Sequence, residues 1–70
     1  MTPKLCRLRL DLYKNKTAIR LGGDCWHEGD WFCSLEPLEY NWLNDGEDYF
    51  EVLYKGEWVE AESVDFDFIN

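Results

Sequence analysis

Apolar residues recur at every second position in several short runs of this chain, and turn-forming residues separate the runs. The clearest example is Asp48–Tyr54, which is followed by Lys55-Gly56 and then by Glu57–Ala61. Two alternating runs joined by a two-residue loop that contains glycine are typical of a β-hairpin. Because alternation buries one face of each strand, the pattern predicts an antiparallel β fold.

The two-residue loop also determines which residues of this hairpin face each other. Four cross-strand pairs follow, with Val52–Val59 and Phe50–Ala61 on the buried face and Leu53–Trp58 and Glu51–Glu60 on the other face. The run from Val52 to Val59 resembles the hairpin found late in SH3-like and Tudor-like barrels. This resemblance concerns architecture, so it implies a small barrel and no functional residues.

A second hairpin is predicted at the N-terminus. Leu5–Tyr13 alternates apolar with charged residues, Thr17–Leu21 forms another short run, and Asn15-Lys16 lies between them. An even-length turn there would place Leu12 opposite Ile19 and Leu10 opposite Leu21 in the core, and Asp11 opposite Arg20 on the outer face.

Two further strands are predicted, at Trp31–Leu35 and at Val64–Ile69. In the last of these, Val64, Phe66 and Phe68 would point inward. The stretch between Ser34 and Leu43 fits two interpretations, because Leu35, Leu38 and Trp42 have helical spacing while Leu38, Tyr40 and Trp42 also alternate as in a strand. We favour a short helix around residues 35–43.

The predicted fold class is therefore mainly β. Residues 1–70 are expected to form a single small domain, either a small SH3-like barrel or a rolled antiparallel sheet of five to six strands. Four Trp, four Tyr and four Phe compensate for the short chain, since each ring can bury about 150–250 Å².

Charge is segregated along the chain. Residues 1–20 carry six basic side chains and one acidic side chain, whereas residues 21–70 carry fourteen acids and one base. The two segments therefore contribute +5 and −13 to the net charge of −8. Strong acidity argues against direct binding to nucleic acid or to an anionic membrane, because phosphate contacts need Lys and Arg. A basic protein surface is the expected partner.

A cytoplasmic location is expected from the absence of a signal-peptide run, of a long apolar segment and of an even cysteine count. The residues predicted to bind the partner are the nine acids from Asp45 onward together with one outward-facing aromatic: Asp45, Glu47, Asp48, Glu51, Glu57, Trp58, Glu60, Glu62, Asp65 and Asp67.

The Glu51–Glu60 pair has two interpretations, because like charges directly opposite each other destabilise a sheet. In the first, the N-terminal strand lies alongside and Arg7 and Arg9 neutralise the pair. In the second, the carboxylates stay exposed for a cationic partner.

Successive acids on the same face of a strand are about 6.6–6.8 Å apart. This spacing is roughly twice the distance of about 3.4 Å between successive phosphates along one DNA strand. Such a face could imitate a nucleic-acid backbone, and small acidic phage anti-restriction and anti-CRISPR proteins resemble this chain in size and charge. The simpler alternative is that the carboxylates keep an aromatic domain soluble. A different function is an SH3-like adaptor or self-associating module that uses an aromatic patch around Trp58.

Catalytic and metal sites are not expected. Cys6, Cys25, His27 and Cys33 could together ligate zinc, but they lack the closely spaced pairs of structural zinc sites. Asn44–Asp48 contains oxygen ligands yet is shorter than a twelve-residue calcium loop. A single histidine in so short a chain leaves little room for a nucleophilic active site. We therefore predict a non-enzymatic protein without cofactors.

Overall fold

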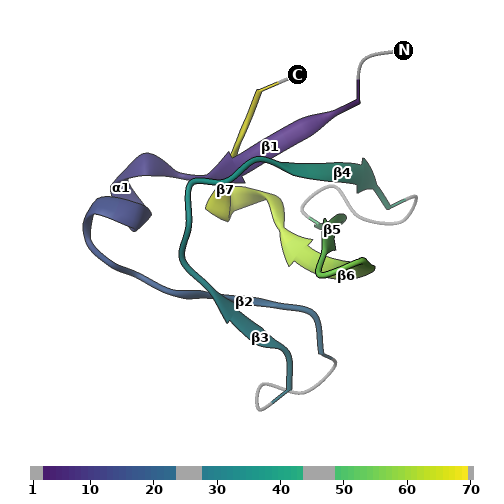
Figure 1. Ribbon diagram of the computed structural model, residues 1–70, viewed down its shortest axis with the longest axis horizontal. Helices are drawn as coiled ribbons and strands as arrows, with labels where there is room; N and C mark the ends of the chain where they lie inside the picture. The colour runs from purple at the N-terminus through teal and green to yellow at the C-terminus, as the bar shows by residue number, and fades with distance from the viewer. Residues whose placement is uncertain (1–2, 24–27, 44–48, 70) are drawn as a thin grey trace.

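The computed structural model describes residues 3–23, 28–43 and 49–69. Over these residues the chain forms, in order, β1 (Leu5–Leu8), α1 (Leu10–Lys14), β2 (Ile19–Leu21), β3 (Asp30–Phe32), β4 (Leu38–Trp42), β5 (Tyr49–Tyr54), β6 (Glu57–Glu62), the 3-10 turn η1 (Ser63–Asp65) and β7 (Phe66–Phe68) (Figure 1).

Five of these strands form one antiparallel sheet in the order β6-β5-β4-β1-β7, and β2 pairs with β3 in a second, smaller sheet. The prediction of a mainly β fold is confirmed. The expectation of a barrel is wrong for the described residues, because β6 and β7 are the two ends of an open sheet.

The core lies between the two sheets. Its most deeply buried side chains are Cys6, Leu8, Leu21, Phe50 and Val52. Phe50 is fully buried, with its ring centroid 5.5–5.6 Å from those of Tyr40, Trp42, Phe66 and Phe68. Aromatic packing therefore compensates for the small number of residues, as the composition predicted.

The β5–β6 hairpin is confirmed in full. All four predicted cross-strand pairs are present, including Leu53 opposite Trp58 and Glu51 opposite Glu60. Lys55 and Gly56 both have positive φ, 53° and 81°, which is the conformation of a type I′ turn. The twist of this turn matches that of the flanking strands, so local chemistry alone specifies the hairpin.

The predicted N-terminal hairpin is wrong. The first strand ends at Leu8, pairs with β4 on one side and β7 on the other, and is followed by the helix α1. The turn expected at Asn15-Lys16 is instead the end of this helix. Thr17 N donates to Leu12 O, Lys16 N donates to Tyr13 O, and Lys16 has φ of 56°. These features form a Schellman motif.

Long-range pairing explains the difference. Alternation in Leu5–Tyr13 indicates a strand but not its neighbour, and β1 pairs with two strands from later in the chain. Consequently Leu12 does not face Ile19, Leu10 does not face Leu21 and Asp11 does not face Arg20. In β2, Arg20 lies opposite Trp31 of β3, with its guanidinium carbon 5.7 Å from the Trp31 ring centroid.

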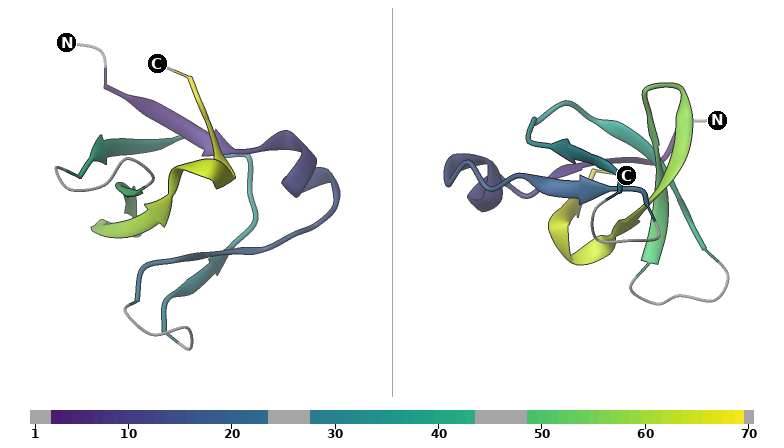
Figure 2. Two further views of the ribbon diagram at one scale, coloured as in Figure 1. Left: turned by 180° about the vertical axis from the view of Figure 1, so that it is seen from behind. Right: turned by 90° about the horizontal axis from the view of Figure 1, so that it is seen from below.

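The β2–β3 pair is attached to the free edge of β6. Gly22 N donates to Glu60 O at 2.8 Å, and the view from behind shows β2 and β3 extending from the larger sheet (Figure 2, left). The third predicted strand, Trp31–Leu35, is shorter in the structure and ends at Phe32.

The stretch around residues 35–43 is a strand, so the preferred helix is wrong and the alternative is right. Leu38 and Tyr40 are buried on one face of β4, which lies between β1 and β5. Pairing on both sides stabilises the extended conformation against the helical spacing. Among the described residues, the short helix is α1 instead.

The last strand is also shorter than predicted. Phe66 is buried as expected, whereas Val64 lies in η1 and is 57% exposed. Phe68 is 42% exposed, although its ring lies against those of Tyr40 and Trp42. Within the described ranges, no helix has the length and apolar character needed to span a membrane.

Candidate functional site

The outer face of β4, β5 and β6 is acidic. Glu39 of β4, Glu51 of β5 and Glu60 of β6 lie on three neighbouring strands, on the face opposite the buried residues Tyr40, Val52 and Ala61. None of the three strands contains a lysine or an arginine. We call this surface, with Leu53 and Trp58, the acidic face.

Glu51 and Glu60 are direct cross-strand neighbours on the acidic face. Like charges in this position destabilise a sheet by roughly 0.2–1 kcal/mol. The ion pairs between described residues are Arg9–Asp11 and Lys55–Asp30, so neither glutamate is paired with a cation there. A cation supplied from outside would therefore relieve an unfavourable interaction within the sheet.

Arg7 and Arg9 do not neutralise this pair. β4 lies between β1 and β5, so the two arginines are separated from Glu51 by a whole strand. Arg7 lies opposite Asp67 of β7, and Arg9 binds Asp11. Of the two interpretations left by the sequence, the structure excludes neutralisation by the N-terminal strand.

An apolar patch lies at one end of the acidic face. Trp58 is 45% exposed and stands opposite Leu53, which is half-buried. Half-exposed aromatic side chains bordered by polar residues are common in protein interfaces. The same face therefore offers both negative charge and apolar area.

The remaining predicted site residues are divided among other places. Glu62 of β6 and Asp65 of η1 border a cavity of about 290 Å³, which is also lined by Glu60 of the acidic face and by Arg20 of β2. The Nε atom of Arg20 is buried there with no hydrogen-bond partner among the described residues. Burial, reinforced by the negative charge of Glu62, raises the pKa of Asp65 above its ordinary value.

Glu57 and Asp67 lie away from the acidic face. Glu57 follows the β5–β6 turn, beside the Lys55–Asp30 ion pair of 3.2 Å. Asp67 is on β7 at the opposite end of the strand order, facing Arg7. The positions of Asp45, Glu47 and Asp48 lie outside the described residues, as does the Asn44–Asp48 turn.

Sequence reasoning missed one member of the acidic face, Glu39. The alternation of Leu38, Tyr40 and Trp42 contained the signal, because in a strand Glu39 must point to the face opposite these residues. The helical interpretation of this stretch concealed it. Arg20 was also assigned the wrong neighbour, since its position near Glu60 depends on how β2 meets β6.

The candidate zinc ligands fall in different environments. Cys6 is fully buried in the core, and burial raises the pKa of its thiol to about 12, so it stays protonated at neutral pH. Cys33 is exposed, whereas Cys25 and His27 lie outside the described residues. Within the described part of the chain, no group of three or more potential metal ligands comes together.

Comparison with known proteins leaves the arrangement of the acidic face as the main guide to function. The chain matches no known protein family, no curated protein and no solved structure.

Proposed function

We propose that this protein is a non-enzymatic binding module whose acidic face docks on a basic protein surface. One observation carries the proposal. Carboxylates from three adjacent strands share one face with an exposed tryptophan, and those strands contain no basic residue. A partner that brings lysine or arginine to this face would offset the repulsion between Glu51 and Glu60.

The most concrete form of this function is inhibition of a nucleic-acid-handling enzyme by imitation of a phosphate backbone. Because Glu51 and Glu60 face each other across neighbouring strands, their Cβ atoms are roughly 5 Å apart. Glu60 and Glu62 lie two residues apart on the same face of β6, so their backbone positions are about 6.6–6.8 Å apart. Arginine and lysine side chains that bind phosphates also bind carboxylates, through the same kind of charge-assisted hydrogen bond. In this proposal the protein binds such an enzyme in the cytoplasm.

A second candidate is an adaptor or self-associating module that binds through the aromatic patch around Trp58. It is supported by the 45% exposure of Trp58 beside Leu53. The two candidates differ in which contact dominates binding, so they can be separated by substitution.

The first experiment is capture of the partner from a lysate of the source organism, followed by titration at increasing salt. For the acidic mechanism we expect affinity to fall about tenfold or more between low and high ionic strength. Glu51→Lys with Glu60→Lys should abolish binding, whereas Asp67→Lys on β7 is the matched control and should change it little. Affinity indifferent to salt and to Glu51 and Glu60 would reject the acidic mechanism.

The same titration tests the second candidate. If the aromatic patch dominates, Trp58→Ala abolishes binding while the charge reversals have little effect. The hypothesis of nucleic-acid imitation makes one further prediction. Duplex DNA or RNA should compete with the protein for its partner, while the protein itself binds neither.

A further inference from the structure

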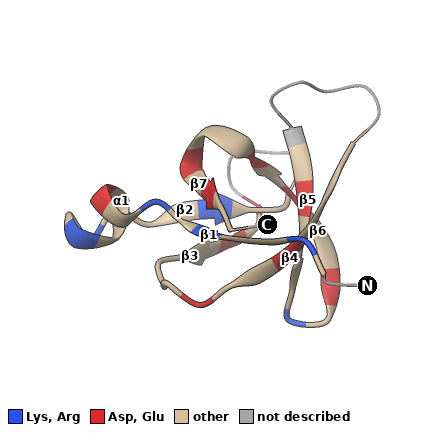
Figure 3. Ribbon diagram, turned by 90° about the horizontal axis from the view of Figure 1, so that it is seen from above, with Lys and Arg blue, Asp and Glu red and all other residues tan. Residues whose placement is uncertain are grey.

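The helix α1 projects from the body of the protein. None of its residues is buried, and both ribbon views place it at the opposite side of the molecule from β5 and β6 (Figures 1 and 3). The helix nevertheless carries apolar side chains, with Leu10 44% and Tyr13 41% exposed. Residues three apart lie on the same side of a helix, so these two form one small apolar patch.

Lysines border this patch. Lys14 ends the helix, and Lys16 follows it in the Schellman motif; both are exposed. The ion pairs of the described residues involve neither lysine. We call Leu10, Tyr13, Lys14 and Lys16 the basic knob. It is held in place because Arg9, just before the helix, binds Asp11 and the Val64 carbonyl.

The basic knob and the acidic face are complementary in two respects. Each has exposed apolar side chains, Leu10 and Tyr13 on one and Leu53 and Trp58 on the other. Each borders them with charged side chains, of opposite sign on the two surfaces, that form no ion pair with another described residue. Their position on opposite sides of the molecule (Figure 3) prevents the knob from reaching the acidic face of its own chain.

We propose that the basic knob of one molecule docks on the acidic face of a second copy. This inference rests on the proposed function, because it assigns an occupant to the same face. Two different surfaces meet, so the contact is head-to-tail, and each added copy leaves one knob and one face free. Self-association of this kind produces open chains, and an external basic partner would compete with it.

The association must be weak. A five-residue helix covers far less than the standard interface of about 1,600 Å², and the net charge of −8 makes the copies repel at long range. We therefore expect a dissociation constant of about 100 μM or weaker. For open chains with a dissociation constant of about 100 μM, sedimentation equilibrium of the wild type should show a weight-average mass close to that of the monomer at roughly 20 μM and several times larger at about 1 mM.

The decisive experiment uses two variants that each lack one half of the contact. The knob variant carries Lys14→Gln and Lys16→Gln, and the face variant carries Trp58→Ala and Glu60→Gln. Each alone should remain a monomer at about 1 mM, because a contact this small does not survive the loss of one of its two surfaces. Mixed together they should form a one-to-one dimer, because the face variant keeps its knob and the knob variant keeps its face.

Isotope labelling locates the contact. In the mixture, amide shifts of the labelled face variant should concentrate at Leu10, Tyr13 and Lys14, and those of the labelled knob variant at Glu39, Glu51 and Leu53. Lys4→Gln is the matched control for Lys16→Gln. Lys4 carries the same charge and lies directly before β1, at the end of that strand away from α1. It should leave the self-association unchanged, whereas Lys16→Gln should weaken it severalfold.

A wild type that stays monomeric at the highest concentration, a mixture that forms no dimer, or shifts that map elsewhere would each overturn the inference. Failure of the proposed function would look different. The knob variant retains the acidic face, so it should still bind a captured partner in a salt-dependent manner even if self-docking is absent. Unchanged partner binding by the face variant would instead contradict the proposed function.

Discussion

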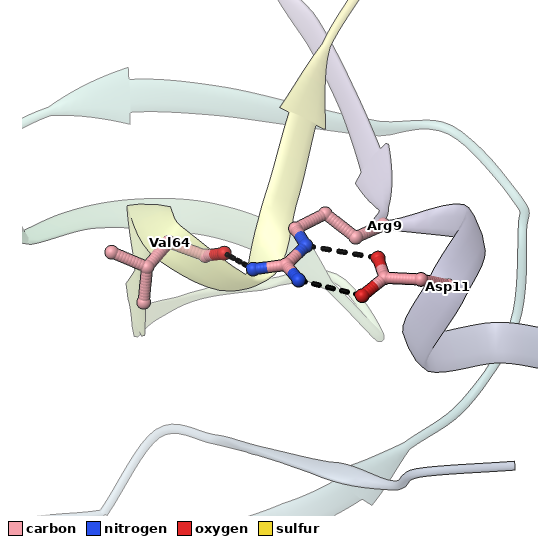
Figure 4. A network of polar contacts seen from close by, with 3 residues as sticks. All are labelled: Arg9, Asp11 and Val64. Carbon is pink, nitrogen blue, oxygen red and sulfur yellow. Dashed lines mark hydrogen bonds and ion pairs between the residues drawn. The ribbon is translucent and has the colours of Figure 1, made fainter. Parts of the chain in front are cut away.

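Arg9 binds Asp11 through two hydrogen bonds, from Nε to Oδ1 at 3.0 Å and from Nη2 to Oδ2 at 2.6 Å, while its Nη1 donates to the Val64 carbonyl at 2.8 Å (Figure 4). One guanidinium thus joins the first turn of α1 to η1, although Arg9 and Val64 are 55 residues apart in the chain. The contact pairs Arg9 with an acid of its own N-terminal segment, a whole strand away from Glu51 and Glu60.

The Arg9–Asp11 contact should give stability a specific dependence on pH. The hydrogen bond from Arg9 lowers the pKa of Asp11 below its ordinary value of 3.8. A depressed carboxyl pKa stabilises the fold above the unfolded-state pKa, and this contribution is lost as pH falls through the folded-state value. Asp11→Asn should therefore lower the thermal midpoint slightly at pH 7 and not at about pH 2. A deficit that persists undiminished at the lower pH would contradict this assignment.

Asp65 should show the opposite dependence. Burial raises its pKa, so the charged form destabilises the fold as pH rises from the unfolded-state value through the folded-state value. We expect Asp65→Asn to increase the free energy of unfolding at pH 7, within the roughly 0.5 kcal/mol typical of surface substitutions. Below about pH 3 the gain should vanish, because both states are then protonated. Urea denaturation at the two pH values measures it, and a loss at pH 7 would be the contrary result.

Phe50 should contribute more to stability than any residue of the acidic face. It is fully buried and contacts four other aromatic rings. Phe50→Ala should cost about 3–5 kcal/mol in the free energy of unfolding, enough to unfold many domains of this size. Trp58→Ala on the outer face is the control, and we expect it to fold. Circular dichroism during thermal denaturation compares them, and a cost below about 1 kcal/mol for Phe50→Ala would be inconsistent with this packing.

Substitution of Gly56 separates the effect of backbone conformation on stability from the effect of side-chain packing. A Cβ at this position would meet no atom within 4 Å, yet its φ of 81° belongs to the left-handed region that side chains disfavour. Gly56→Ala should therefore destabilise the protein by about 1–2 kcal/mol, and Gly56→Asn by less, because asparagine tolerates positive φ. Equal stability of all three proteins in chemical denaturation would show that the type I′ turn is not required.

The β5–β6 hairpin illustrates what local sequence specifies. Its turn residues and its alternation act over a few positions, so the strand register, the Glu51–Glu60 pair and the outward position of Trp58 could be predicted from the sequence alone. The wrong predictions concern Leu5–Tyr13 and the stretch around residues 35–43. The stretch around residues 35–43 fitted two local conformations, whereas Leu5–Tyr13 was assigned a single conformation, a strand paired with Thr17–Leu21. In both segments, contacts with distant strands decided the structure.

For the candidate site the division is similar. The sequence by itself determined an aromatic, strongly acidic β fold and the two glutamates that face each other across its clearest hairpin. The tertiary structure alone decided that β4 adds Glu39 to that face, that Arg7 and Arg9 lie a strand away from it, and that α1 projects from the opposite side. Period-two alternation determines which face of a strand is buried but not which strand lies beside it, since that depends on burying the whole core at once.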